Sequence, residues 1–233
     1  MRKVLLTPRR DIPYSCLTLI FLTALTAAWA SAAPAQPAAA MRVGSASGAV
    51  WVVSDGKKKA AQEGMTLAAG DRVETGRPGR AEIIIENGTL MSLEPGSSFM
   101  IGNAVGAGAD LELTAGTLLA RVRTLAAAEH WRVRAYAAVI AVRGTELGVS
   151  VDDQKAVHAA VFNEGEVLVS SDAGEPVALQ YDHETTVRAG QPPAPPQALD
   201  YFRFAAKRMA ELRKRQKYFM DLWLKKYKVR KSK

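Results

Sequence analysis

Histidines and carboxylates are the side chains with which this sequence could bind a metal or catalyse a reaction. His130, His158 and His183 lie far apart, and none has a second histidine or a cysteine at the spacing of a zinc site. The triplet at 182–184, Asp-His-Glu, would bind a metal only if the fold brought further ligands to it, so we expect a surface loop there. The sequence therefore predicts no metal site and no cofactor.

Two carboxylate pairs, Asp152-Asp153 and Glu164/Glu166, are close neighbours in the sequence. Glycosidase-type catalysis instead needs two carboxyl groups held across a cleft, about 5–10 Å apart. The sequence also has no nucleophile elbow, no phosphate-binding glycine loop followed by a helix, and no His-Glu-x-x-His motif. We therefore expect a protein that is not an enzyme. A hydrolase of cell-wall polymers, or an accessory to one, is a second alternative.

Arg143 and Glu146 flank Gly144-Thr145 and form the most distinctive polar motif. In a functional interpretation, the two charged residues contact a ligand or a partner. In a structural interpretation, Gly144 permits a positive φ and Thr145 hydrogen-bonds to a neighbouring turn. The surrounding pattern of strands and turns favours the structural interpretation. Arg143 and Glu146 remain candidate partner-binding residues.

The elements that would position these residues are short and β-rich. Over residues 44–190, runs of Val, Ile, Leu and Thr alternate with polar residues and are separated by Gly, Asn, Asp or Pro. Asn87-Gly88 lies between two such runs and favours the tight turn of a β-hairpin. Many short strands at spacings of roughly 8–12 residues predict one all-β domain.

A proline-rich linker and a basic helix are predicted after this domain. Residues 191–197 have the composition of a stiff, extended spacer. Residues 198–233 contain neither proline nor glycine, and their apolar residues recur at three- and four-residue steps, interrupted by Arg213 and Gln216. This pattern predicts a basic amphipathic α-helix.

The net charge of +8 is concentrated at the ends of the chain. Residues 198–233 hold 13 basic and 3 acidic residues, whereas residues 34–197 hold 14 basic and 19 acidic ones. A nucleic-acid-binding body is therefore not expected. The helix could bind an anionic membrane surface or an acidic protein, including this chain's own body, or it could cap the β-domain. Its candidate partner-binding residues are Arg208, Lys214, Arg215, Trp223, Lys225 and Lys226.

Residues 1–33 have the three parts of a secretory signal peptide. Four basic residues precede an uncharged apolar run, and small residues then offer cleavage sites. Residues 34–43 form an Ala/Pro-rich linker. An uncleaved membrane anchor is the alternative, although the most apolar part is shorter than the ~20 residues that span a bilayer. In both cases we expect the body to be periplasmic. The single cysteine, Cys16, allows no disulfide within the body.

Five segments of the β-rich region, taken in order, resemble the FecR domain family. They are 64–76 (GMTLAAGDRVETG), with the family's Gly-Asp and Thr-Gly pairs; 81–97, a hairpin followed by LEPGS; 113–122 around Gly116; 142–149 (VRGTELGV), similar to the family's Arg-Gly-Thr-x-Phe-x-Val with Leu147 in place of Phe; and 157–169 around Glu164-Gly165. Each segment alone is weak, but the ordered set is specific. The resemblance covers about residues 44–190.

The resemblance implies a periplasmic all-β domain built as a twisted, solenoid-like stack of short strands. In its best-known setting, the family relays a signal from an outer-membrane iron-siderophore receptor and follows a cytoplasmic anti-sigma segment. Here about 14 residues precede the apolar run, and no βαβ-type module follows residue 190. We therefore do not expect direct control of a sigma factor.

Together these patterns predict an exported, non-catalytic envelope protein that acts as a FecR-type binding or signalling module. Its basic tail would attach to an envelope protein or polymer, or to an anionic membrane surface. The alternative is a membrane-anchored FecR-like regulator that relays a transport or iron signal.

Overall fold

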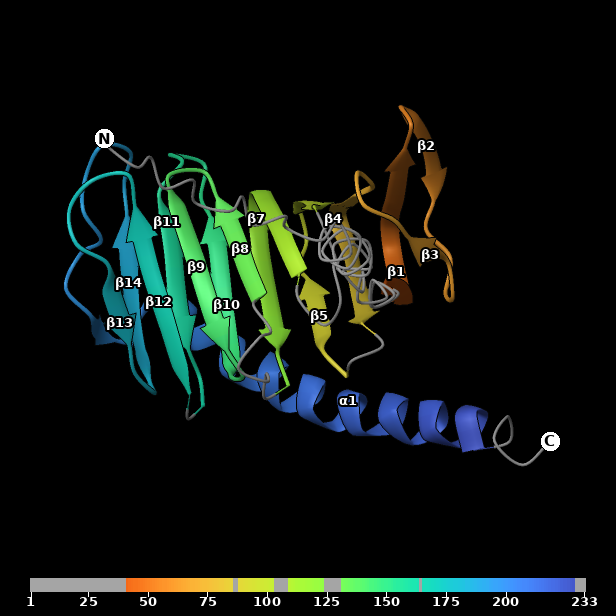
Figure 1. Ribbon diagram of the computed structural model, residues 1–233. Helices are drawn as coiled ribbons and strands as arrows, with labels where there is room; N and C mark the ends of the chain where they lie inside the picture. The colour runs from red at the N-terminus through yellow and green to blue at the C-terminus, as the bar shows by residue number, and fades with distance from the viewer. Residues whose placement is uncertain (1–40, 86–87, 103–108, 124–130, 164, 229–233) are drawn as a thin grey trace, which may run out of the picture. The chain divides into compact units, whose positions relative to one another are not determined.

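The computed structural model describes residues 41–85, 88–102, 109–123, 131–163 and 165–228 (Figure 1). The predicted signal peptide at 1–33, most of the 34–43 linker, Asn87 of the predicted hairpin turn, and residues 229–233 lie outside this part. Side chains of the C-terminal helix are described as far as Phe219, and at Asp221.

Fifteen strands and two helical elements make up the described residues. The strands are β1 (Met41–Ser54), β2 (Lys57–Ala60), β3 (Thr66–Leu67), β4 (Arg72–Ile85), β5 (Leu90–Leu93), β6 (Ser98–Ile101), β7 (Ala109–Arg121), β8 (Trp131–Ala135), β9 (Ala138–Arg143), β10 (Glu146–Val151), β11 (Val157–Val161), β12 (Glu166–Ser171), β13 (Val177–Leu179), β14 (His183–Val187) and β15 (Gln197–Ala198). A 3₁₀ helix, η2 (Tyr201–Phe204), leads into α1 (Ala205–Lys228).

Alternating side chains explain why these segments form strands around an interior. In β8, for example, Trp131, Val133 and Ala135 are buried, and the two arginines between them are exposed. Successive side chains of a strand point to opposite faces, so this pattern buries one face and leaves the other in water. The all-β prediction is confirmed: strands dominate the described residues, and a helix follows them.

The strands form two layers, which share three long strands. Layer A contains the first half of β1, the second halves of β4 and β7, and β5, β10, β11, β14 and β15. Layer B contains β2, the second half of β1, the first halves of β4 and β7, and β6, β8, β9, β12 and β13. β7 passes from layer B to layer A at Gly116, whose φ of +78° suits glycine.

The solenoid-like stack is not the observed architecture. The strands form one continuous sheet that folds over into a small flattened barrel with a single main core. A solenoid repeats the same coil, so each unit contacts only its neighbours. Here β1 and β4 pair antiparallel along both layers, and most later neighbours are also antiparallel, with β7 and β8 the exception.

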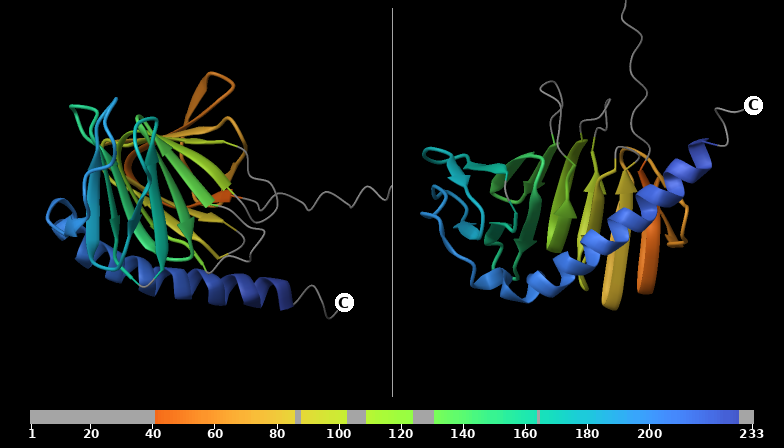
Figure 2. Two further views of the ribbon diagram at one scale, coloured as in Figure 1. Left: turned by 60° about the vertical axis from the view of Figure 1, so that its left-hand side comes forward. Right: turned by 90° about the horizontal axis from the view of Figure 1, so that it is seen from below.

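The C-terminal helix crosses the outer face of layer A (Figure 2). The prediction placed its start at residue 198, but α1 begins at Ala205. Gln197 and Ala198 instead pair with β14, and Ala194 donates its amide hydrogen to the Thr186 carbonyl. The proline-rich segment is therefore held in an extended conformation against the sheet before the chain turns into η2 and α1.

Candidate functional site: the helix groove

The outer face of layer A carries a row of residues that lie directly opposite one another on six neighbouring strands. In order from β4 to β14, they are Glu82, Ser92, Leu119, Gly148, Ala160 and Glu184. Glutamates occupy both ends of the row, and small or apolar residues its middle. η2 and α1 lie over the row. We call this row, together with Leu90, Glu94, Arg121, Glu146 and Phe162 beside it, the helix groove.

Apolar contacts fill the middle of the groove. Phe202, Ala205, Met209 and Leu212 lie against four groove residues and form a second hydrophobic cluster, separate from the main core. Their groove partners are Leu90, Leu119, Ala160 and Phe162. The ring of Phe202 meets that of Phe162 edge to face, with centroids 6.0 Å apart. Burial of these side chains supplies the non-directional part of the helix attachment.

Arg208 joins the helix to two buried glutamates at one side of the groove. It donates to Glu82 at 2.9 Å, to Glu94 at 3.3 Å and to Ser92 at 3.0 Å, and also to Glu211 on its own helix. Burial lowers the pKa of Arg208, but the hydrogen bond to Glu211 and the charges of Glu94 and Glu82 outweigh this and raise the pKa above its usual value. The guanidinium is therefore held charged in a mostly desolvated position.

Glu82 also accepts hydrogen bonds from Arg215 at 2.5 Å and from Ser45 at 3.0 Å, so both of its carboxylate oxygens are hydrogen-bonded. Arg80 completes the neighbouring site by donating to Glu94 through two nitrogens, at 3.0 and 2.6 Å. Buried charges are tolerated when they are paired and hydrogen-bonded, as they are here. The cluster thus joins β4, β5 and α1 through charge-assisted hydrogen bonds.

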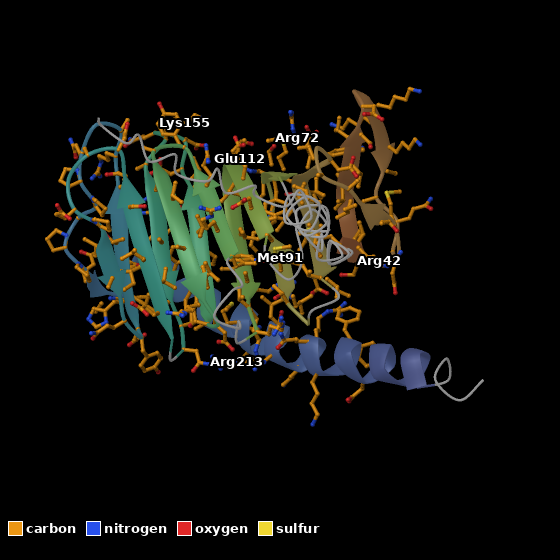
Figure 3. The ribbon with its side chains drawn as sticks, in the orientation of Figure 1. Arg42, Arg72, Met91, Glu112, Lys155 and Arg213 are labelled. Atoms are coloured by element: carbon orange, nitrogen blue, oxygen red, sulfur yellow. The ribbon has the colours of Figure 1, made fainter. Side chains whose placement is uncertain are left out.

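Glu146 forms a second ionic contact on the other side of the helix. Only 1% of Glu146 is exposed, and Arg213 contacts both of its carboxylate oxygens. Arg121 of β7 lies 3.4 Å from the same carboxylate. The hydrogen bond to Glu146 is the main cause that raises the pKa of Arg213. Figure 3 labels Arg213 where α1 passes the ends of the strands.

Glu184 fixes the point at which the helical segment begins. Its carboxylate accepts hydrogen bonds from the backbone amides of Tyr201 at 3.0 Å and Phe202 at 3.2 Å, and from the Gln197 side chain. Asp200, which precedes η2, forms no capping bond with its side chain. The first amides of a helix lack partners within it and carry partial positive charge, so a glutamate from β14 replaces the usual capping residue.

A histidine cluster lies beside the groove, next to Tyr201. His158 contacts Asp152 through Nε2 and Thr186 through Nδ1, both at 3.1 Å. Tyr201 stacks on the imidazole, with ring centroids 3.8 Å apart, and its hydroxyl contacts Ser150 at 3.0 Å. A general base needs a nitrogen within reach of the substrate proton. Both nitrogens of His158 are already engaged, so this cluster anchors η2.

The pKa of Asp152 in this cluster lies below its usual value. Burial raises the pKa, but hydrogen bonds from His158 and from the backbone amides of Ala156 and Gln154 outweigh burial and favour the charged carboxylate. Among the described residues, no group of three His, Cys, Asp or Glu side chains is arranged to hold a metal ion. None of the helices in that part is long and apolar enough to cross a membrane.

The structure divides the predicted partner-binding residues into three groups. Three of them lie inside the groove: Glu146 binds Arg213 of α1, and Arg208 and Arg215 of α1 both bind Glu82 of β4. Arg143 and Lys214 are exposed. Trp223, Lys225 and Lys226 belong to α1, and their side chains lie outside the described part.

Sequence reasoning missed Glu82, Glu94 and Gly148 as parts of this site. The sequence pointed only indirectly to the existence of such polar partners in the sheet. Arg213 and Gln216 interrupt the apolar stripe of the helix, and polar residues on a buried face need partners. Both have them, since Gln216 donates to the carbonyl of Gly88 at 2.6 Å and Arg213 binds Glu146.

Comparisons with known proteins identify the β-rich region. Residues 71–168 match the family model described as FecR protein. Two crystal structures of a candidate anti-sigma factor from Parabacteroides distasonis ATCC 8503, at 2.50 and 1.65 Å resolution, resemble this fold with a TM-score of 0.50 and 15% sequence identity. The similarity covers 58% of this chain and 62–63% of those chains, so it spans less than two thirds of their length.

No curated protein sequence matches this chain. At 15% identity, the crystal structures support the fold alone. The family match includes the groove residues from Glu82 to Phe162 and ends before β14 and α1. The predicted resemblance to the FecR family is therefore confirmed for residues 71–168, which match the FecR family model.

Proposed function

We propose that this chain is an exported, non-catalytic signalling module of the bacterial envelope, in which the FecR domain binds the chain's own C-terminal helix. One observation carries the proposal. The FecR-matched segment supplies the three buried carboxylates, Glu82, Glu94 and Glu146, that contact the arginines of α1. The family relation and the anti-sigma description of the fold relatives support a regulatory role.

The composition of the groove fits a contact that changes during signalling. Its apolar cluster is small and separate from the main core, and charged pairs surround it. Interfaces that form and dissociate are more polar than permanent ones. A ligand or partner that alters β4, β5 or β10 would therefore change how firmly the helix is held.

The outward face of α1 supplies the attachment to the envelope in this proposal. Lys207, Lys214 and Lys217 are exposed, and Tyr218 is 61% exposed. Four more lysines and an arginine occur among residues 225–231. A basic surface of this kind is attracted to anionic lipid headgroups. Because Arg208, Arg213 and Arg215 are bound in the groove, the lysines carry this interaction.

Export and signalling can be tested in one set of strains. We expect a C-terminal alkaline phosphatase fusion to be active with residues 1–33 present and inactive without them. Deleting the gene should change a defined set of transcripts, which the full chain restores and a chain without residues 1–33 does not. An unchanged transcript profile after deletion would contradict the signalling role. Finding the intact N-terminus on the mature protein would favour the membrane-anchored alternative.

A further inference from the structure

The helical segment that covers the groove has two opposite faces. One face, which carries the apolar cluster, packs into the groove. The other face carries a line of residues at alternating steps of three and four, all of them exposed: Phe204, Lys207, Glu211, Lys214 and Tyr218. Residues three and four apart are neighbours on a helix surface, so these five form one continuous stripe. We call them the outer stripe.

Aromatic side chains occupy both ends of the outer stripe. Phe204 is 56% exposed and Tyr218 is 61% exposed. Six large apolar side chains are exposed among the described residues, and three of them belong to η2 and α1. Single exposed apolar residues are common on any protein surface, but several on one face mark a contact surface. The helix therefore presents apolar groups to something other than its own groove.

Lysines lie between the two aromatic ends. Lys207 and Lys214 belong to the outer stripe, and the acidic residues of α1 are Glu211 and Asp221 alone. Glu211 accepts a hydrogen bond from Arg208 at 2.9 Å, which lowers the pKa of Glu211 and balances its charge. The charge of the outer stripe is therefore complementary to an anionic surface.

A bilayer with anionic headgroups satisfies both the lysines and the aromatic side chains. Its surface attracts lysines, and aromatic rings favour the boundary between the headgroups and the acyl chains. Phe204 and Tyr218 are fourteen residues apart, which corresponds to about 21 Å along a helix at 1.5 Å per residue. Two apolar contacts at this separation would hold the helix parallel to the bilayer.

We propose that the outer stripe is a membrane-contact surface, at which Phe204 and Tyr218 insert between the headgroups of an anionic bilayer. The lysines between them bind the lipid phosphates. Because the helix lies on the outer face of layer A (Figure 2), this contact turns layer A toward the bilayer and layer B away from it. The inference rests on the lipid attachment proposed above, and it adds the apolar anchors and the orientation that they fix.

Tryptophan substitutions measure the insertion at single positions, in the protein purified from the envelope as the cell processes it. Phe204→Trp adds an indole at a proposed anchor, and Tyr136→Trp adds one in the exposed turn between β8 and β9. Vesicles of phosphatidylglycerol and brominated phosphatidylcholine quench only the indoles that enter the bilayer. After subtraction of the signal of the unchanged protein, we expect roughly twofold or greater quenching of the added indole at position 204 and none at position 136.

The outcomes separate this inference from the attachment on which it rests. Equal quenching at the two positions would overturn the insertion. If the vesicles bind the protein through its lysines while position 204 stays unquenched, the inference fails and the lipid attachment stands. If the protein does not bind anionic vesicles at all, both fail, and the tests of export and of signalling are unaffected.

A vesicle titration then separates the apolar contribution from the ionic one. Phe204→Ala/Tyr218→Ala should lower the partition constant roughly tenfold or more, because two apolar contacts are lost, and should leave its salt dependence unchanged, because no charge is lost. Replacing Lys207 and Lys214 with Gln should instead flatten the salt dependence. Tyr136→Ala is the control and should bind like wild type. A double aromatic variant that keeps its fold by circular dichroism and binds as tightly as wild type contradicts the proposal.

Discussion

Phe202 occupies the space that a side chain on Gly148 would need: a Cβ added to Gly148 would lie 2.6 Å from Cε1 of Phe202. Gly148 has an ordinary backbone conformation, so the glycine is required by the close approach of the ring. The pair lies at the middle of the row that runs beneath η2, and Phe202 is fully buried there. The packing of η2 against the sheet therefore depends on the absence of a side chain at Gly148 in β10.

We expect Gly148→Ala to destabilise the protein by about 1–3 kcal/mol, because the added methyl group overpacks a filled site. Chemical denaturation measures this loss, and hydrogen exchange of residues 205–219 shows whether the helix loosens. The double variant Gly148→Ala/Phe202→Leu is the control, since leucine is smaller than phenylalanine and makes room for the methyl group. If the two substitutions destabilise additively, the predicted contact does not limit stability.

Arg208→Ala removes one guanidinium from two buried glutamates. We expect a loss of about 3 kcal/mol in the free energy of unfolding, because Glu82 and Glu94 remain buried with fewer partners. Lys214→Ala, a change of an exposed residue on the same helix, should stay within about 0.5 kcal/mol of wild type. Equal stabilities of the two variants in urea denaturation would show that the ionic contact with Arg208 contributes little.

The capping role of Glu184 predicts a graded series. Glu184→Ala removes the acceptor for the Tyr201 and Phe202 amides and should cost about 1–2 kcal/mol. Glu184→Gln keeps one acceptor oxygen but loses the charge, so it should cost less. Asp200→Ala should have little effect, because Asp200 forms no capping bond. The order of the three unfolding free energies tests which residue caps the helix.

The pKa of Asp152 predicts a specific dependence of stability on pH. Its folded-state pKa lies below the usual 3.8, so folding favours the ionised carboxylate. The resulting stabilisation is complete above the unfolded-state pKa and is lost as the pH falls through the folded-state pKa. Asp152→Asn should therefore be less stable than wild type at pH 7, and the difference should shrink below about pH 4. Asp153→Asn, at the exposed neighbour, serves as the control in thermal denaturation.

The lysine face of α1 predicts salt-sensitive binding to membranes. We expect the mature protein to sediment with anionic vesicles at low salt and to be released as the salt concentration rises. Replacing Lys207, Lys214 and Lys217 with Gln should weaken binding by about 1 kcal/mol for each lysine. Neutral vesicles are the control. Persistent binding of the triple variant would assign the interaction to other residues.

The family and the fold class could be predicted because they depend on local patterns. Glycine pairs at strand ends and alternating apolar residues mark each strand, and residues 71–168 indeed match the FecR family. The folding of the sheet into two layers could not be predicted, because it depends on pairing between distant residues such as Met41 and Ile85. Local alternation does not specify which strands become neighbours.

The docking of the helix was one of several alternatives left open by the sequence. A signal for it existed in β10 and β11, whose residues, apart from Glu146 and His158, are apolar or small on both faces. Strands covered on both sides have this composition. In β10 all six residues from Glu146 to Val151 are buried. What the sequence could not show is that Glu82 would bind arginines of α1, or that Arg213 of α1 would bind Glu146, because these partners lie far apart in the chain.

The three strands shared between the layers make one end of the domain harder to open than the other. β1, β4 and β7 continue from one layer into the other, so the layers cannot part there without breaking a hydrogen-bonded ladder. At the opposite end, β11 and β12 are close neighbours along the chain, as are β13 and β14. The two layers are therefore joined by continuous strands along β1, β4 and β7, and in the described part of the chain no strand continues between them at β12–β14. Thermal motion or an applied force should separate the layers first at β12–β14, next to β14 and β15, after which the chain enters the C-terminal helix.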